Sequence, residues 1–433
     1  MHREIFIATQ NADSPLEQAA LNAYYRGDLA AAEKHYRRLL NSDSHNALLH
    51  NNLANVLRKT EQWTQAHAHY LQALEAAPAA AKIRNNLAGM FEELEQYDRA
   101  EAEYRHALAL QPDFAEARFN LGLLLLSGGH YSQGWQYYEA RAQLFREHGS
   151  LPFPQWQGED VTGKTFWLLP EQGYGDTIQF VRYAALLKAR GAAQISVLCN
   201  PPLAPLLSTA PGIDTLITRP EALKTHDYWD SLVSLPGRFN TLLESIPAPI
   251  PYLSVFAERV QTWGARLPKE GLRVGLVWQG NPEHGNDAQR SLRHFSELEP
   301  LWSIQGIRFV SLQMGPAEEQ TETCEARQPI VRLGHEINDF GDTAAIVAQL
   351  NLVICVDTAV AHVAGALGIA CWVMLPRRGA DWRWLHIGSQ SRWYPDGMYL
   401  FRQSKAGWPA LIEEVKNALA ELARQRYSQT QIN

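Results

Sequence analysis

The chain has 433 residues and a formal net charge of −7, and 46% of its residues are hydrophobic and 20% charged. This is an ordinary globular composition, and the length allows two or three domains. The sequence has no long basic run, so nucleic acid is not expected as the main partner, because phosphate binding requires concentrated lysine and arginine.

The N-terminal segment MHREIFIATQ lacks the apolar core of a secretory signal, and we predict a cytoplasmic protein. The four cysteines lie far apart, without a CxxC pattern or zinc-ligand spacing. The longest apolar stretch, residues 350–376, contains Asp357 and His362. We expect it to form a strand, a helix and a strand and not a membrane span.

A repeat of 34 residues dominates residues 14–149. An Asn-Leu-small motif recurs with this period at Asn52, Asn86 and Asn120, and aromatic, small and tyrosine positions follow it at constant spacing. This period and this alternation of small and large residues are typical of the tetratricopeptide helix pair. We therefore expect residues 1–150 to form an α solenoid of about four helix pairs, whose concave face holds a protein or peptide.

The three recurring asparagines have two interpretations. In the first, they form a polar ladder on the inner helices that binds the backbone of a peptide. In the second, their side chains cap groups within the helix stack. The aromatic residues that follow them in each repeat are expected to pack between helices.

The pattern changes at Leu151, where a linker rich in proline and glycine begins. An apolar run at 166–170, a glycine-rich loop and an amphipathic stretch from Thr177 to Ala189 then give strand, loop and helix, the unit of a parallel α/β sheet. The further strands expected in this first Rossmann-like lobe, residues 151–265, are 195–198, 215–218 and 231–235.

A second Rossmann-like lobe is expected over residues 266–405. Its strands are predicted at 273–278, 307–313, 352–357 and 371–376. An amphipathic helix over about 408–426, within the C-terminal segment 406–433, is expected to cross back. Parallel α/β sheets bind ligands at the carboxyl ends of their strands, which here places the ligand between the lobes.

The first loop of interest contains Gln172, Gly173, Tyr174 and Gly175 ahead of Asp176. The glycines permit a tight turn and a close approach of the backbone. Asp176 follows a strand at the start of a helix, so it is either a helix N-cap or a carboxylate base that takes a proton from an acceptor hydroxyl or amide. A base requires an oxygen that faces the cleft.

The strand that ends at Asp357 is followed by Thr358, Ala359 and, one helical turn later, His362. Unpaired N–H groups at the start of this helix would form an anion site, which suits a diphosphate. A capping aspartate with a packed histidine is the alternative.

Two further loops carry polar and aromatic residues toward the same cleft. After the strand at 273–278, Arg290 or Arg293 could neutralise a leaving phosphate, unless this is a plain surface loop. The segment from Asp381 to Arg383 interleaves aromatic and charged residues, which suits stacking on a sugar or base as well as packing between elements. No DxD, HExxH, GxSxG or Walker A motif is found, so no metal is expected.

Four ordered segments, PQWQGEDVTGKTFWLLPEQGYGDTIQFVRY, GLVWQGNPEHGNDAQRSL, DFGDTAAIVAQLNLVICVDTAVAHVAGALG and DWRWL, resemble the bacterial tetratricopeptide-repeat glycosyltransferases. Their catalytic part is similar to the heptosyltransferase group, family 9. The resemblance implies a GT-B architecture and an inverting, metal-independent transfer from a nucleotide-sugar co-substrate, with no cofactor. Asp176 matches the family's base, and Asp357, Thr358 and Ala359 match its diphosphate site. The donor-side residues assigned here are Trp278, Gln279, Gly280, Asn281, Arg290, Arg293, Gln313, Asp357, Thr358, Ala359, His362, Asp381, Trp382 and Arg383.

The chain departs from heptosyltransferases at one point, since no lysine lies between Trp278 and Arg293, and an arginine would have to act there. The short first lobe argues against a lipopolysaccharide acceptor, and the repeats favour a protein acceptor such as flagellin or another surface protein. Two rivals stay open: an interaction scaffold whose lobes are inactive, and a glycolipid glycosyltransferase whose repeats serve only assembly.

Overall fold

The computed structural model describes residues 14–145, 151–219, 225–247, 249–322 and 330–430. The chain divides at residues 147 and 148 into two compact units, which we call the repeat unit and the two-lobed unit and describe separately.

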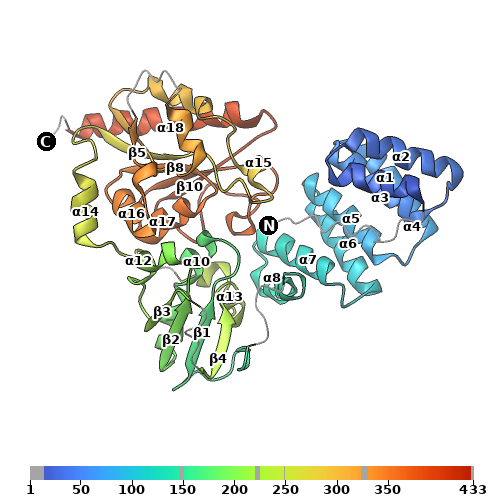
Figure 1. The fold of residues 1–433 in the computed structure, drawn as a ribbon, viewed down its shortest axis with the longest axis horizontal. Helices are drawn as coiled ribbons and strands as arrows, with labels where there is room; N and C mark the ends of the chain where they lie inside the picture. Colours follow the sequence, from blue (N-terminus) through green and yellow to red (C-terminus); the bar gives the residue numbers. More distant parts are fainter. Residues whose placement is uncertain (1–13, 146–150, 220–224, 248, 323–329, 431–433) are drawn as a thin grey trace. The chain divides into compact units, whose positions relative to one another are not determined.

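The repeat unit consists of helices that pack as successive antiparallel pairs, as Figure 1 shows. The helices are α1 (Pro15–Tyr25), α2 (Leu29–Ser42), α3 (Ala47–Lys59), α4 (Trp63–Ala76), α5 (Ala81–Glu93), α6 (Tyr97–Leu110), α7 (Ala115–Ser127), α8 (Tyr131–Tyr138) and α9 (Arg141–Leu144). Over the described residues, α1 to α8 make the four expected pairs.

The repeated small and large residues account for this packing. Ala54 and Ala88 on the first helices of their pairs, and Ala66 and Ala100 on the second helices, are fully buried, because only a small side chain fits where the helices approach. The tyrosines that recur in each repeat, such as Tyr70, fill the space beside them.

The first lobe is a parallel four-stranded sheet of order β3-β2-β1-β4. Its strands are β1 (Thr165–Leu169), β2 (Gln194–Leu198), β3 (Thr215–Ile217) and β4 (Tyr228–Ser231). Its helices are α10 (Tyr174–Phe180), α11 (Tyr183–Ala189), α12 (Ala204–Leu207) and α13 (Leu235–Arg238), with short 3₁₀ turns η1 (Pro201–Leu203) and η3 (Leu243–Ser245).

Two expectations for this lobe are wrong. The strand placed at 231–235 lies at Tyr228–Ser231 instead, because the apolar residues Leu232 and Val233 are buried in a turn that follows the strand. The single helix expected over 177–189 starts earlier, at Tyr174, and is interrupted by a turn at Val181 and Arg182.

The second lobe is a parallel six-stranded sheet of order β10-β9-β8-β5-β6-β7. Its strands are β5 (Leu272–Val277), β6 (Ile307–Ser311), β7 (Val331–Arg332), β8 (Leu352–Val356), β9 (Cys371–Leu375) and β10 (Met398–Arg402). Its helices and 3₁₀ turns are α14 (Ala257–Gly264), α15 (Asp287–Arg290), η4 (Phe295–Ser303), η5 (Pro316–Thr321), η6 (Gly334–Glu336), α16 (Phe340–Val347), α17 (Ala359–Leu367), η7 (Trp382–Trp384) and α18 (Gly407–Thr430). The four expected strands are present, and the two edge strands β7 and β10 were not predicted from the sequence.

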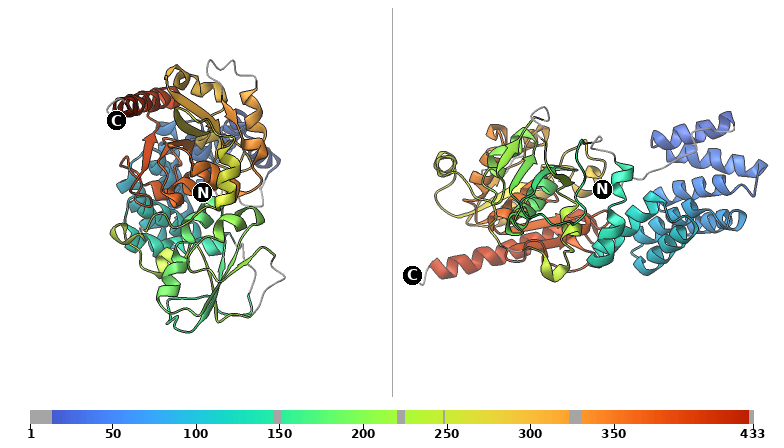
Figure 2. Two further views of the ribbon diagram at one scale, coloured as in Figure 1. Left: turned by 90° about the vertical axis from the view of Figure 1, so that its left-hand side faces the viewer. Right: turned by 90° about the horizontal axis from the view of Figure 1, so that it is seen from below.

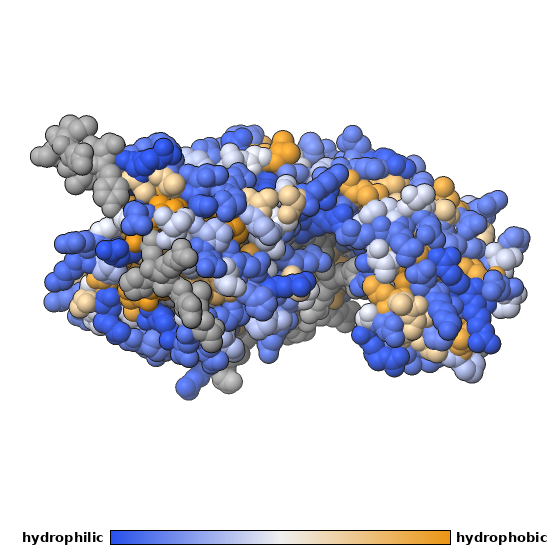
Figure 3. Space-filling model, turned by 90° about the horizontal axis from the view of Figure 1, so that it is seen from above, coloured by the Kyte–Doolittle hydropathy of each residue, from blue (hydrophilic) through white to orange (hydrophobic). Residues whose placement is uncertain are grey.

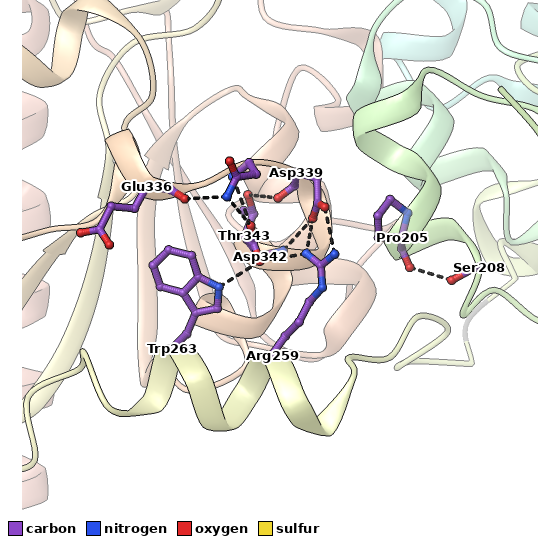
Figure 4. Close-up of polar contacts among 9 residues, drawn as sticks. Pro205, Ser208, Arg259, Trp263, Glu336, Asp339, Asp342 and Thr343 are labelled. Atoms are coloured by element: carbon purple, nitrogen blue, oxygen red, sulfur yellow. Dashed lines mark hydrogen bonds and ion pairs between the residues drawn. The ribbon is translucent and has the colours of Figure 1, made fainter. Parts of the chain in front are cut away.

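Helix α14 belongs with the second lobe, although the boundary expected at residue 265 places it in the first. Figure 4 shows Arg259 of α14 reaching the start of α16, where its guanidinium pairs with Asp339 and donates to Asp342 over 2.8 Å. The indole of Trp263 donates to the same Asp342 over 3.0 Å. The chain therefore changes lobe before α14.

Helix α18 lies along the second lobe in the views of Figure 1 and Figure 2. Its buried face, with Leu411, Ile412, Val415 and Leu419, packs into the core of that lobe. We expected α18 to return to the first lobe. The contacts between the lobes at the candidate site come instead from other segments.

The face of the molecule in Figure 3 is mostly hydrophilic, with small and separate hydrophobic patches. Among the residues that the structure describes, no helix combines the length and apolar character needed to cross a membrane.

Candidate active site

The two lobes meet where α10 packs against α17. Helix α10 follows β1 and α17 follows β8, so the carboxyl ends of the central strands of both sheets converge at this contact. An added Cβ at Gly175 would lie 2.6 Å from Cδ2 of His362, closer than packed atoms allow. The glycine predicted to permit a close approach therefore does so across the lobe interface.

Asp176 lies in the first turn of α10, where Gly173 is the N-cap. Its Oδ2 accepts the backbone N–H of Gly173 over 2.8 Å, so it closes the helix start from the third position and is not the N-cap itself. Its Oδ1 accepts a hydrogen bond from Nη2 of Arg383 over 2.5 Å. Only 8% of the residue is exposed, so both carboxylate oxygens are engaged inside the interface.

Arg383 comes from η7 of the second lobe and is buried. Its Nε lies 3.1 Å from Oδ1 of Asp381, and its backbone N–H donates to the same oxygen over 3.0 Å. The neighbouring Trp382 stacks on Phe180 of α10 with ring centroids 6.3 Å apart. This segment, which we assigned to the donor, therefore docks onto the first lobe.

Arg182 is a second buried cation at the interface, and sequence reasoning missed it. It lies in the turn between α10 and α11 and donates to the carbonyl oxygens of Pro247 and Trp393, each over 3.1 Å. It also donates to the Tyr252 hydroxyl over 3.0 Å and lies over the rings of Tyr252 and Tyr394. Its signal in the sequence is a lone arginine within the apolar stretch IQFVRYAALL.

His362 on α17 is packed and not open to a ligand. Its Nδ1 lies 3.0 Å from the Tyr394 hydroxyl, and its ring stacks on Trp384 at 5.4 Å. Burial, with the nearby charges of Arg383 and Arg182, holds the pKa of His362 well below its usual value, so the ring is neutral at pH 7. This geometry fits the packed-histidine interpretation.

The start of α17 keeps the features of an anion site. Thr358 is its N-cap, in extended backbone conformation, and within the described chain its side chain caps none of the helix N–H groups. The helix begins at Ala359. Burial raises the pKa of the adjacent Asp357, as does Asp381, while Arg290 and Arg383 lower it. The positive charges of two arginines therefore act on Asp357, directly before the N-cap of α17.

Two residues assigned to the donor instead hold the loop that follows β5. The side chain of Gln313 accepts the N–H groups of Trp278 and Gln279 over 3.1 and 3.0 Å, and it donates to the Gln279 and Met314 carbonyls, each over 3.2 Å. The side chain of Trp278 is fully buried, 4.6 Å from the Phe295 ring. The Gln313 side chain is thus bonded to backbone groups, and the Trp278 side chain is packed in the core. We therefore do not include these two side chains in the proposed donor site.

The two arginines of this loop differ in position. Arg290 is half-buried beside Gly280, pairs with Asp287 at 3.4 Å, and acts electrostatically on Asp357. Arg293 is exposed, as is Asn281, whose Oδ1 accepts the Glu283 N–H in a local turn. Arg290 is therefore the better placed of the two to meet a phosphate.

The acceptor-side loop is held by local contacts. Gln172 adopts a left-handed backbone conformation with φ of 69°, which reverses the chain between β1 and α10. Tyr174 is 38% exposed, and its ring meets Phe340 of the second lobe edge to face at 5.2 Å. An aromatic pair thus lies on the solvent side of the same interface.

In the repeat unit, two of the recurring asparagines, Asn86 and Asn120, bond to the preceding repeat. Nδ2 of Asn86 donates to Asn51 over 2.9 Å, and Nδ2 of Asn120 donates to Asn85 over 3.1 Å. Asn52 is buried and accepts from Asn51 over 3.3 Å. These bonds fit the second interpretation, in which the asparagine side chains bond to groups within the helix stack. Peptide binding by the half-exposed Asn86 and Asn120 stays a prediction.

Comparison with known proteins begins with the repeat unit. A family model described as TPR repeat matches residues 90–129, and one described as tetratricopeptide repeat matches residues 18–81 and 51–107. The repeat unit is therefore built of tetratricopeptide repeats.

Protein FlbA of Caulobacter vibrioides is 27% identical to this chain over 332 residues, which covers 69% of this chain and 54% of FlbA. The chain thus spans about half the length of this curated relative.

Two solved structures are similar in fold to the chain. The glycosyl transferase family 9 protein from Veillonella parvula has a TM-score of 0.45 and 13% identity, covering 62% of this chain and 99% of its own. The E. coli ADP-heptose lps heptosyltransferase II has a TM-score of 0.45 and 14% identity, covering 60% and 99%. The expected tetratricopeptide solenoid, followed by two lobes with parallel α/β sheets, is confirmed by the repeat models and by the two sheets.

Proposed function

We propose that this protein is an inverting, metal-independent glycosyltransferase that moves a sugar from a nucleotide-diphosphate sugar to a protein held by the repeat unit. The observation that carries the proposal is the packing of α10 on α17. It brings a carboxylate, Asp176, into the same interface as α17, whose N-cap side chain caps no helix N–H group. Arg383 bonds to Asp176, and the charges of Arg383 and Arg290 lower the pKa of Asp357, directly before that helix.

In the proposed reaction, an acceptor hydroxyl oxygen attacks the anomeric carbon of the sugar. The bond from that carbon to the β-phosphate oxygen breaks, and Oδ1 of Asp176 takes the hydroxyl proton. The nucleoside diphosphate leaves with the bonding electron pair. Its charge is stabilised by the N–H groups at the start of α17 and by the Arg290 guanidinium.

The proposed acceptor is a protein, such as flagellin or another surface protein that is modified in the cytoplasm before export. Tetratricopeptide arrays offer extended concave surfaces that bind polypeptides, which supports a protein acceptor over a glycolipid. The half-exposed Asn86 and Asn120 of α5 and α7 are the residues that we propose to contact its backbone.

The test is mass spectrometry of surface proteins co-expressed with the chain. The wild type should add one fixed mass to one protein, and Asp176→Asn should add none, because loss of a general base slows transfer by about 10² to 10⁴-fold. Asp160→Asn is the matched control: Asp160 is an exposed aspartate of the first lobe that accepts hydrogen bonds from nearby Thr162, so this variant should keep the modification. Continued modification by Asp176→Asn would remove Asp176 from the mechanism.

A second candidate is a scaffold with inactive lobes. It is favoured by one specific observation, namely that both oxygens of Asp176 are already bonded. Calorimetry with a panel of nucleotide sugars separates the two candidates, because a scaffold should bind none of them.

A further inference from the structure

The ion pair between Asp176 and Arg383 joins residues 207 positions apart, on different lobes. The two side chains are 11% and 5% exposed, so water screens the pair poorly. Breaking a buried pair leaves an uncompensated charge and is strongly unfavourable unless another charge replaces the lost partner. The pair is therefore one of the contacts that join the lobes, and only another charge can replace a lost partner without a large cost.

Arg383 is the member of the pair that an anionic ligand would attract. It lies among three carboxylates: two contact it directly, from Asp176 and Asp381, and the third, Asp357, interacts through its charge. Asp357 immediately precedes Thr358, the N-cap of α17. A diphosphate bound at that helix start would bring more negative charge to Arg383 than one carboxylate does, and two of its oxygens can accept both N–H groups of the planar guanidinium.

If Arg383 moved away, only one of the two carboxylate oxygens of Asp176 would lose its hydrogen bond. Its Oδ2 is anchored by the N–H of Gly173 within the same helix start. Its Oδ1 is bonded to Arg383. Loss of Arg383 therefore leaves the carboxylate oriented by Gly173, with Oδ1 able to accept a proton.

We propose that the Asp176–Arg383 pair is a latch: Arg383 blocks Asp176 in the free enzyme and moves to the donor diphosphate when the donor binds. This inference rests on the proposed function, since it takes Asp176 as the base. The latch makes Arg383 a positioning residue and sets an order of binding, with the donor before the acceptor. It also accounts for a base with no unbonded oxygen in the absence of donor.

The first measurement needs no ligand. Hydrogen exchange in the full chain is compared for wild type, Asp176→Asn and Arg383→Gln. Either variant should speed exchange in both segments of the latch, residues 174–182 and 381–385, because each segment loses its partner on the other lobe. Unchanged exchange at 381–385 in Asp176→Asn would overturn the latch.

The matched control is Arg238→Gln. Arg238 pairs with the fully buried Asp230 at 3.1 Å, but both residues belong to the first lobe. Exchange should therefore rise around β4 and α13 and stay unchanged at 381–385. A rise at 381–385 in this control would show that any lost ion pair loosens the interface, which would overturn the specific role of Asp176.

The second measurement is calorimetric titration with UDP, GDP, ADP, CDP and dTDP. Asp176→Asn should bind the preferred nucleotide about tenfold more tightly, because Arg383 no longer has to leave a carboxylate. Arg383→Gln should bind it about tenfold more weakly, because a charged phosphate ligand is lost. A purely structural ion pair predicts effects of the same sign in both variants.

The outcomes separate the latch from the proposed function. If the wild type binds a nucleoside diphosphate and Asp176→Asn binds it no more tightly, the latch is wrong and the glycosyltransferase proposal stands. If neither protein binds any of the five nucleotides, the glycosyltransferase proposal fails and the latch fails with it.

Discussion

The contacts that stabilise each of the two units differ in the sequence separation of the residues they join. In the repeat unit, the same polar contact recurs between successive repeats, as in Asn51 with Asn86 and Asn85 with Asn120, each 35 residues apart. In the two-lobed unit, the contacts that define the site join residues 207 and 211 apart, Asp176 with Arg383 and Arg182 with Trp393. The first kind of contact recurs along the solenoid, whereas each of the second kind occurs once at the interface.

This difference has a consequence for how the units respond to change. A repeat contributes stability through its own fold and its nearest neighbours, so damage stays local. The interlobe cluster combines buried cations, aromatic rings and a neutral histidine, and loss of one member leaves the others with unsatisfied partners. A substitution that removes one contact should therefore lower stability more at the interface between the lobes than in the repeat unit.

The largest effect is expected from Arg182→Met. Methionine fills similar space but leaves the Pro247 and Trp393 carbonyls and the Tyr252 hydroxyl without their donor. The two-lobed unit should lose about 4 kcal/mol of unfolding free energy, since each buried unsatisfied group costs roughly 1 to 3 kcal/mol. Chemical denaturation followed by tryptophan fluorescence measures the loss.

The control is Arg424→Met, whose arginine is exposed on α18 and pairs with Glu421. An exposed ion pair of this kind contributes less than about 0.5 kcal/mol. Equal losses in the two variants would contradict a special role for the buried arginine.

In the repeat unit, the next largest effect is expected at Gly122. A Cβ there would lie 2.6 Å from the backbone nitrogen of Tyr138, so α7 or α8 would have to move. We expect Gly122→Ala to cost about 3 kcal/mol, at the upper end of overpacking. Hydrogen exchange should accelerate in α7 and α8 and remain unchanged in α1 and α2, because repeats contact only neighbours.

Gly285→Ala is the matched control, since nothing lies within 4 Å of an added Cβ at Gly285. It should leave exchange unchanged in both units. If Gly122→Ala accelerated exchange as far as α1, the solenoid would unfold as one cooperative block and the comparison drawn above would fail.

Sequence reasoning worked best where structure depends on local pattern. The period at Asn52, Asn86 and Asn120 was sufficient to predict the helix pairs, because small and large residues recur at fixed places on adjoining helices. Apolar runs flanked by loops were sufficient for the main strands, whose register follows from burial. The glycine-rich loop before Asp176 was expected to allow a close approach, and Gly175 meets His362.

The site geometry was beyond local pattern. A sequence shows that Arg383 and Trp382 are charged and aromatic, but not that they contact Asp176 and Phe180 of the first lobe, about 200 residues earlier. Trp278 was assigned to the donor because it ends a strand, yet its side chain turns into the core beside Phe295. Which face of a strand end is buried depends on the rest of the lobe, and a single sequence does not contain that information.

Two buried groups, His386 in the two-lobed unit and Glu92 in the repeat unit, should contribute to the pH dependence of stability in opposite directions. Burial, with the charge of Arg402, lowers the pKa of His386 to about 4, and burial lowers that of His362 as well. The folded two-lobed unit therefore binds protons less readily than the unfolded chain and loses stability as pH falls below about 6.5. His386 alone should account for about 2 kcal/mol between pH 7.5 and pH 5.

In the repeat unit, burial raises the pKa of Glu92 to about 7, even though the Tyr104 hydroxyl donates to its carboxylate. The folded form then binds a proton at Glu92 more readily than the unfolded chain does, so the contribution of Glu92 to stability falls as pH rises through 7, by about 1 kcal/mol between pH 6 and 8. Hydrogen exchange of each unit, corrected for intrinsic rates, measures both trends. Glu92→Gln and His386→Gln should each flatten the trend of their own unit only, and crossed effects would contradict the comparison.

The smallest effect is expected from Asn86→Ala, which removes one contact between neighbouring repeats. Its Nδ2 donates to Asn51 over 2.9 Å, and loss of such a half-buried bond should cost about 1 kcal/mol, confined to α3 and α5. Asn120→Ala should do the same one repeat later, because the bond from Asn120 to Asn85 is equivalent. Thermal unfolding measures this cost, and modification of the co-expressed acceptor measures the proposed second role. If stability falls while modification is unchanged, these asparagines only join repeats; if modification falls far more than stability, they also contact the acceptor.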